Sequence, residues 1–260
     1  MQKIIDILFR AVVIALAMLV IFITARVFVC DRFRIKGKSM TPTLVQGKYV
    51  YVNKLLMGAR IYKSFDFDTP ELKCFRMPGL RNLRAGDIAV FNYPYGWEKD
   101  EIGFKINYVY AKRCIAAPRD TLWIENGFFR NSNTMDIGVP LDAQKTLSSL
   151  SDEEIENYRV AMRAFAFAGS AVKWTIRDFG PLYIPGKGDE MVMDEYNSKL
   201  YGVLVRYETG SLPDPGSRYV FKNNYYFFCG DNVLDSRDSR YFGLVPEDYV
   251  VGISGDSVPH

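Results

Sequence analysis

Histidine is nearly absent from this sequence, because the one copy, His260, is the last of the 260 residues. A serine nucleophile needs a positioned base, which is usually histidine, and a residue at a chain terminus is poorly placed for that role. The sequence therefore excludes a catalytic triad built on histidine. It also excludes a Cys/His zinc site, since the cysteines show no CxxC spacing.

Cysteine is scarce and neither sign of charge dominates. Cys30, Cys74, Cys114 and Cys229 each lie in or beside an apolar stretch, which predicts buried free thiols; a disulfide would require an exported domain. The 33 lysines and arginines nearly balance the 30 aspartates and glutamates. This balance gives no reason to expect nucleic acid as a partner. We also find no internal repeat or low-complexity tract.

A long apolar run near the N-terminus is the first positive feature. Residues 4–24 are almost entirely apolar apart from Asp6 and Arg10, and Arg26 follows them. About 20 apolar residues cross a hydrocarbon core of about 30 Å, so residues 1–29 are predicted to form a transmembrane anchor. A cleaved signal peptide is the alternative. More basic residues follow the span than precede it, and the positive-inside rule alone would place the rest of the chain in the cytoplasm.

Aromatic residues, which suit the half-buried surface of a sheet, make up 15% of the chain. Many of them occur in short apolar segments with strand patterns. Strands are predicted at residues 48–53, 87–93, 107–116 and 225–229. Residues 122–130 predict a hairpin whose Asn126-Gly127 turn favours type I′ geometry. We therefore expect a mainly β protein.

Helical periodicity appears in the second half of the chain. Ser151 offers an N-cap, and apolar residues from Ile155 to Phe165 recur at helical spacing, which predicts a helix of about four turns. A second helix is predicted from Asp194, ending before the GSLPDPGS segment at 210–217.

These patterns divide the chain into three parts. After the anchor at 1–29, residues 30–130 and 221–260 are expected to form one β domain. Residues 131–220 are expected to form an α+β subdomain inserted into it.

Lys112 interrupts the apolar strand YVYAKRCIAAP. With histidine excluded, a neutral lysine amine is the remaining base for a serine such as Ser39, in the segment GKSMTPTL. The pKa of free lysine is about 10.4, and burial on an apolar strand lowers it. The alternative is an edge-strand lysine that prevents aggregation. The local pattern leaves both interpretations open.

Four segments in order resemble type I signal peptidases, membrane-bound Ser/Lys proteases that remove signal peptides from exported proteins. They are GKSMTPTL at 37–44, LRAGDIAVFNYP at 83–94, AKRCIAAPRD at 111–120 and GDNVLDSRDSRYFGLVPEDYVVG at 230–252. The resemblance implies a signal-peptidase-like β catalytic domain that needs neither metal nor organic cofactor. It also implies a single-pass protein of the cytoplasmic membrane, with the catalytic domain on the extracytoplasmic side and with membrane lipid and the signal peptides of preproteins as partners.

The resemblance also assigns site residues. Ser39 is the expected nucleophile, and Lys112 is the expected general base, which later protonates the leaving amine. The expected supporting residues are Ser236 as an orienting hydroxyl, Gly37 beside the oxyanion, and Asp231, Arg113, Asp238 and Arg240 as ion pairs that hold the loop against the lysine strand. The expected substrate pockets are formed by Phe33, Ile35, Met40, Leu44, Val90 and Ala111, for which core packing is the alternative.

Two other functions are compatible with part of this pattern. One is a different Ser/Lys protease, such as a self-cleaving repressor, although such proteins resemble soluble chains with a DNA-binding half. The other is a catalytically silent, membrane-tethered binding protein of the same fold. The pattern gives no oligomeric state.

Overall fold

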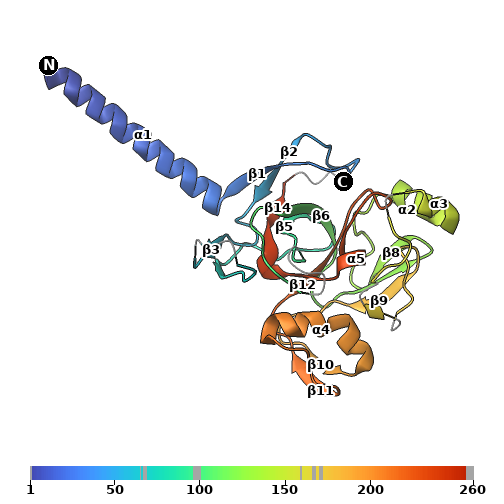
Figure 1. Ribbon diagram of the computed structural model, residues 1–260. Helices are drawn as coiled ribbons and strands as arrows, with labels where there is room; N and C mark the ends of the chain where they lie inside the picture. The colour runs from blue at the N-terminus through green and yellow to red at the C-terminus, as the bar shows by residue number, and fades with distance from the viewer. Residues whose placement is uncertain are drawn as a thin grey trace.

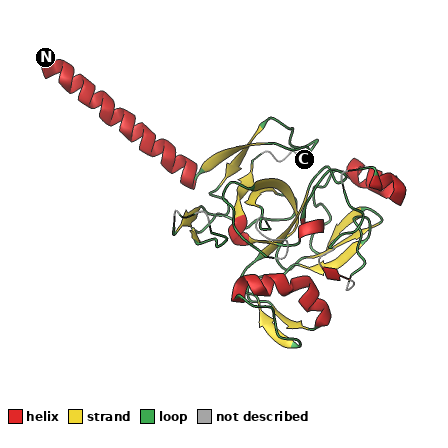
Figure 2. Cartoon of the chain, viewed as in Figure 1, coloured by secondary structure: helices red, strands yellow, loops and turns green. Residues whose placement is uncertain are grey.

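A single long helix projects from a body built mostly of strands (Figure 1). The computed structural model describes residues 2–64, 66, 69–95, 101–158, 160–165, 168–169 and 172–255. His260 lies outside the described residues. The mainly β architecture predicted from the aromatic segments is confirmed (Figure 2).

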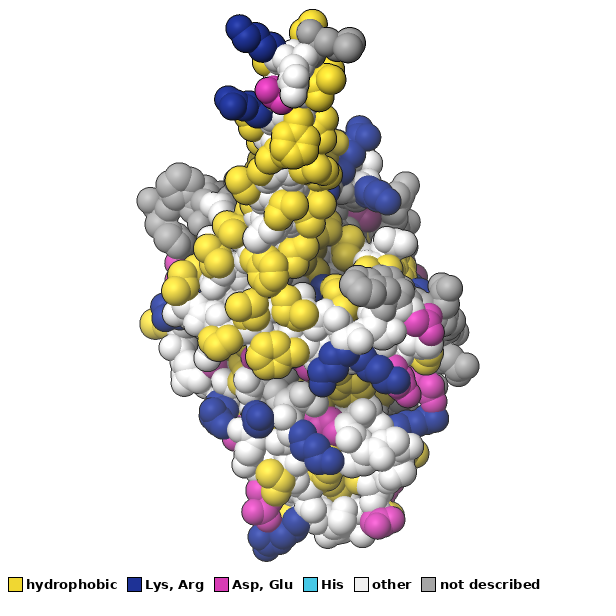
Figure 3. Space-filling view, turned by 90° about the vertical axis from the view of Figure 1, so that its left-hand side faces the viewer, with side chains coloured by type: hydrophobic (Ala, Val, Ile, Leu, Met, Phe, Trp, Pro, Cys, Tyr) yellow, Lys and Arg dark blue, Asp and Glu magenta, His cyan; other side chains and the backbone are white. Residues whose placement is uncertain are grey.

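The projecting helix α1 spans Gln2–Phe28 and buries none of its residues. Figure 3 shows hydrophobic side chains along most of its length, with basic side chains near its free end. Within the described part of the chain, it is the one helix long and apolar enough to cross a membrane. An exposed apolar helix of this length is stable only where something other than water surrounds it.

A seven-stranded, curled antiparallel sheet forms the centre of the body (Figure 2). In spatial order its strands are β1 (Cys30–Arg34), β2 (Tyr49–Asn53), β14 (Val250–Ser254), β5 (Ile88–Asn92), β6 (Val109–Ala116), β12 (Tyr225–Cys229) and β13 (Val245–Pro246). The four predicted strands are β2, β5, β6 and β12, and all of them belong to this sheet. The sheet thus brings segments from both ends of the sequence together.

Three smaller sheets surround the central one. They comprise β8 (Phe128–Asn131), β7 (Thr121–Glu125) and β9 (Phe179–Tyr183); β10 (Glu190–Met193) and β11 (Ser217–Val220); and β3 (Arg60–Tyr62) and β4 (Cys74–Arg76). The predicted hairpin is β7–β8. Its turn residues Asn126 and Gly127 have φ values of 48° and 83°, as a type I′ turn requires.

The helices of the body are short except for one. They are α2 (Leu141–Ser149), α3 (Asp152–Glu156), α4 (Glu195–Thr209), α5 (Ser239–Phe242) and the 3₁₀ turn η2 (Glu247–Tyr249). The predicted second helix is α4, which Asp194 caps and which ends at Gly210 with a φ of 84°.

The predicted four-turn helix after Ser151 is wrong. Ser151 does cap α3 through a capping box, but α3 ends at Glu156. Phe165 has a φ of 48°, which is incompatible with a right-handed helix. Its ring packs against Trp174 and Phe179, so the apolar spacing reflects packing in the core.

The prediction that all four cysteines are buried is also wrong. All four are free, but only Cys114 and Cys229 are buried, Cys74 is half-buried and Cys30 is exposed. Cys30 is the first residue of β1, an edge strand directly after α1 that pairs only with β2, which leaves the cysteine exposed.

Three clusters of buried side chains hold the body together. The largest joins Ile124 and Phe227, which flank the proposed insertion, to Leu147 and Leu204, which lie inside it. The segment at 131–220 therefore shares a hydrophobic core with both flanking segments, and its standing as a separate subdomain stays a prediction. The smallest cluster includes Met40 and lies between β2 and β5, beneath the groove described next.

Candidate active site

A groove of about 630 Å³ opens between the end of β1, the loop that follows it, and β6. Ser39, Gly37 and Lys112 all line this groove. So do five of the six residues predicted for the substrate pockets, namely Phe33, Ile35, Met40, Val90 and Ala111. The sixth, Leu44, does not line it, because its side chain is 6% exposed and packs into the cluster beneath. The roles of these residues stay predictions.

The loop between β1 and β2 positions Ser39. Met40 is buried and ties the loop to the cluster between β2 and β5. The Thr41 amide donates to the Lys38 carbonyl at 3.0 Å, which closes a turn around the serine. The Asn232 amide donates to the Ser39 carbonyl at 3.0 Å. The half-exposed serine is therefore held in position by backbone hydrogen bonds, and its hydroxyl is not needed to hold the loop.

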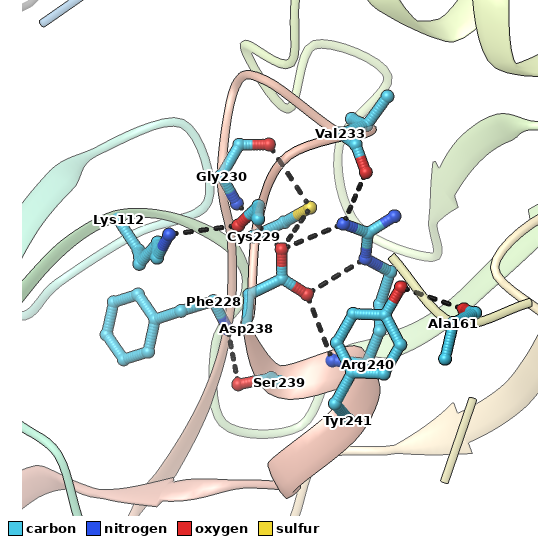
Figure 4. Close-up of polar contacts among 11 residues, drawn as sticks. Lys112, Ala161, Phe228, Cys229, Gly230, Val233, Asp238, Ser239, Arg240 and Tyr241 are labelled. Atoms are coloured by element: carbon cyan, nitrogen blue, oxygen red, sulfur yellow. Dashed lines mark hydrogen bonds and ion pairs between the residues drawn. The ribbon is translucent and has the colours of Figure 1, made fainter. Parts of the chain in front are cut away.

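Lys112 lies on β6, with β5 on one side and β12 on the other, and is 3% exposed. It is thus not the edge-strand lysine considered as an alternative. Its Nζ donates to Ser236 Oγ at 2.9 Å (Figure 4). Burial lowers the pKa of Lys112, and the attraction of Asp238, which acts in the opposite direction, does not offset it.

A buried ion pair supports the loop that carries Ser236. Asp238 and Arg240 are both 0% exposed and form two parallel bonds, Nε to Oδ1 at 2.8 Å and Nη2 to Oδ2 at 2.9 Å. Asp238 also accepts from the Gly230 amide at 3.1 Å, and Arg240 donates to the Val233 carbonyl (Figure 4). Burial raises the pKa of Asp238, but Arg240, Lys112 and a hydrogen bond from Ser236 reverse that effect and lower it.

A second ion pair joins the lysine strand to Asp231, in the segment that also carries Ser236. Arg113 and Asp231 form two bonds, Nε to Oδ1 at 2.8 Å and Nη2 to Oδ2 at 2.7 Å, and the Thr43 hydroxyl also donates to Asp231. Arg113 Nη1 reaches the Gly86 carbonyl at 2.7 Å. One carboxylate therefore connects β6 with the segment that follows Ser39. The four charged residues expected to form ion pairs do so as two pairs, but only Arg113–Asp231 joins the loop to the lysine strand, because Asp238 and Arg240 both belong to the last segment.

Close backbone approach at Gly230 is a feature that the sequence analysis missed. A Cβ atom at this position would lie within 3.0 Å of both Ser236 Oγ and the Ser39 carbonyl oxygen. Only glycine allows the serine loop and the Ser236 loop to meet this closely. The signal was available, since Gly230 opens the last of the four quoted segments.

The arrangement suits acyl transfer. A half-exposed hydroxyl and a buried amine line one groove, and apolar side chains form much of the groove's wall. A lysine with a lowered pKa is the kind of base that activates a serine without histidine. Among the residues that the structure describes, no group of three histidine, cysteine or acidic side chains is placed to hold a metal ion.

Comparison with known proteins gives the family. The sequence pattern of the family described as "Signal peptidase, peptidase S26" matches residues 7–255. Signal peptidase I of Aquifex aeolicus is 25% identical over 231 residues, which cover 87% of this chain and 75% of that protein. Signal peptidase I of Buchnera aphidicola subsp. Schizaphis graminum is 26% identical over 237 residues, which cover 87% of this chain and 67% of that protein.

A solved signal peptidase I from Enterococcus faecalis V583 aligns with 66% of this chain and 96% of its own, at 20% identity and a TM-score of 0.30. We therefore infer the fold from the strands of this chain alone. Since the family pattern extends from within α1 to the end of β14, the chain belongs to the signal peptidase family, peptidase S26, and is a serine endopeptidase.

Proposed function

We propose that this protein removes signal peptides from exported preproteins, with Ser39 as the nucleophile and Lys112 as the general base. One observation carries the proposal: the buried Lys112 amine lies in the same groove as Ser39 and is held by Ser236 at 2.9 Å. The matched family and the names of the relatives support the choice of substrate.

The proposed reaction follows from the chemistry of these groups. The neutral Lys112 amine takes the proton of the Ser39 hydroxyl as Oγ attacks the scissile carbonyl. The resulting ammonium then protonates the leaving amine, and the peptide bond breaks to give an acyl-enzyme. A water molecule, deprotonated by the same amine, hydrolyses the ester and regenerates the serine. The Ser39 amide is the expected donor to the oxyanion, with the Gly37 backbone in support; removal of one such donor costs about 10²- to 10³-fold in rate.

Small apolar side chains before the cleaved bond fit the groove. Val90 and Ala111 are cross-strand partners on β5 and β6, and Ile35 lines the same groove. We propose that these side chains, with Phe33 and Met40, accept short residues such as the alanines of an Ala-x-Ala site. Leu44 would support this wall from beneath.

We propose that the anchor holds this groove near a membrane surface. Helix α1 leads directly into β1, and Arg32 and Phe33 of β1 already line the groove. We propose that α1 spans the cytoplasmic membrane, that lipid is therefore a partner, and that residues 30–255 lie on the extracytoplasmic side. Exported preproteins present their cleavage sites there, which we weigh above the basic residues after the span. Within this body, we propose residues 131–220 as the inserted part.

The experiment is cleavage of a preprotein with an Ala-x-Ala site by the full-length protein in detergent. Ser39→Ala and Lys112→Ala should both abolish cleavage. Lys145→Ala is the matched control, because this exposed lysine lies on α2, outside the groove, and its loss should leave the rate unchanged. A binding protein of the same fold would cut nothing, another Ser/Lys protease would cut at a different bond, and cleavage that survives in Lys112→Ala would eliminate the proposed base.

A further inference from the structure

A second groove of about 600 Å³ adjoins the first. Its lining comes from Tyr93 and Tyr95, which follow β5, from α4 and Leu212 after it, and from the segment around α5. Arg237 lines both grooves, so the two meet at this residue. Two of the four segments that resemble known peptidases supply part of this lining, namely Tyr93, Arg237, Tyr241 and Phe242, but no site role was expected for these residues.

Aromatic rings run continuously from the first groove into the second. Tyr108 and Tyr110 line the first groove, and Tyr93 lines the second. The Tyr93 ring centroid lies 5.1 Å from that of Tyr108 and 5.0 Å from that of Tyr110. Beyond Tyr93, the rings of Tyr95 and Phe242 continue the wall of the second groove. Tyr108 is 40% exposed, whereas Tyr93, Tyr95 and Phe242 are 3%, 8% and 6% exposed, so a peptide would meet most ring surface at the end of the path in the first groove.

Arg237 differs from the other two basic residues of the second groove in its partners. Lys199 is paired with Glu195 at 2.6 Å, and Arg206 is paired with Glu101. Within the described part of the chain, Arg237 has no carboxylate partner at ion-pair distance. Its Nη2 donates to the Tyr93 hydroxyl at 3.3 Å, and its Cζ lies 5.8 Å from the centroid of that ring. The guanidinium is thus exposed, held in place and free to bind a carboxylate.

Arg237 lies next to the group that is proposed to act on the leaving side of the scissile bond. In the proposed reaction Lys112 protonates the leaving amine, so the segment that follows the bond departs past the lysine. Ser236, which accepts a hydrogen bond from Lys112 Nζ, is the residue directly before Arg237. The two grooves therefore meet at the residue next to the hydroxyl that holds the proposed base.

We infer that Arg237 is a specificity-determining residue that binds an acidic side chain among the first residues after the cleaved bond, along a path from the first groove into the second. The inference rests on the proposed function. A guanidinium forms paired hydrogen bonds with a carboxylate, and an aromatic wall accepts whatever side chains flank it. The preferred substrates are thus preproteins whose mature part begins with an acidic residue near the cut.

The test uses the full-length protein in detergent and a set of peptides that share one Ala-x-Ala site. Each peptide carries a single Asp at the first, second, third or fourth position after the bond, and its partner carries Asn at the same place. The ratio of kcat/KM for Asp over Asn is measured at each position for wild type, Arg237→Gln, Arg237→Lys and Arg237→Glu. Arg218→Gln is the matched control, because Arg218 lies on β11, outside both grooves.

We expect wild type to prefer Asp by about fivefold at one position, as exposed ion pairs of this kind contribute. The preference should appear mainly in KM, should fall to about one in Arg237→Gln, persist in Arg237→Lys and reverse in Arg237→Glu, with Arg218→Gln like wild type. A wild-type ratio of one at every position, or a preference unchanged in Arg237→Gln, overturns the inference. If the Asn peptides are cut at the expected bond, that result leaves the proposed function standing; if Ser39→Ala cuts as well as wild type, both fail.

Discussion

The Nζ atom of Lys112 donates a hydrogen bond to Ser236 Oγ at 2.9 Å, inside a body where the lysine is 3% exposed. Two residues further along, Asp238 accepts two hydrogen bonds from Arg240, of 2.8 and 2.9 Å. The buried ion pair therefore fixes the short loop that carries Ser236, and Ser236 in turn holds the amine of the proposed base. Substitutions of these residues should have different effects.

Ser236 should orient the amine without taking part in bond making. Ser236→Ala removes the hydroxyl but leaves Lys112 buried, so we expect cleavage to fall by about 10- to 100-fold, the equivalent of one hydrogen bond to an ionisable group. Ser236→Thr keeps a hydroxyl and should recover much of the rate. The comparison of kcat/KM for the two variants on one peptide tests this. Equal rates for Ser236→Ala and wild type would mean that the amine needs no such partner.

Gly230 should tolerate no side chain. A Cβ atom there would meet Ser236 Oγ and the Ser39 carbonyl within 3.0 Å, so Gly230→Ala must push the serine loop away from the lysine side of the site. Because a displacement of about 1 Å costs about 10²-fold in rate, we expect a loss of at least that size.

Gly255→Ala is the control, since nothing lies within 4 Å of a Cβ added there. Peptide cleavage and thermal unfolding should be measured together for both variants. A fully active Gly230→Ala protein would contradict the close approach of the two loops.

Asp238 should stabilise the fold as well as the site. Asp238→Asn leaves the Arg240 charge uncompensated at 0% exposure, which typically costs about 3–5 kcal/mol in the free energy of unfolding. The control is Glu190→Gln, which breaks the ion pair with Arg218. In this pair the side chain of Arg218 is 76% exposed and that of Glu190 is 50% exposed. That change should cost about 1 kcal/mol or less. Denaturant unfolding of the three proteins checks the contrast, and equal losses would refute it.

The burial of Lys112 could be expected from sequence because the lysine interrupts an apolar strand. The local pattern did not decide between a base and an edge-strand lysine, and the role of Lys112 as the base stays a prediction. Four of the seven strands of the central sheet, β2, β5, β6 and β12, were predicted because each is a short apolar run bounded by turn residues.

The sequence analysis failed where contacts between distant parts of the chain decide the structure. The spacing from Ile155 to Phe165 looks helical, but the tertiary contacts of Phe165 with Trp174 and Phe179 decide its conformation. Gly230 matters through a loop almost 200 residues away in sequence, and no local pattern reports that meeting. Arg237 sits inside a quoted segment, yet its place between two grooves depends on how that segment meets β5 and β6.

The most direct test of the central claim, that the buried amine of Lys112 is the base, is the pH dependence of kcat/KM on a peptide without titratable groups near the bond. The base acts when neutral, so the rate should rise with pH as Lys112 loses its proton. Burial lowers that pKa from the ordinary lysine value of 10.5, so the midpoint of the rise should lie below 10.5. A midpoint at 10.5 or above, or the same rise in residual activity of Lys112→Ala, would contradict the account.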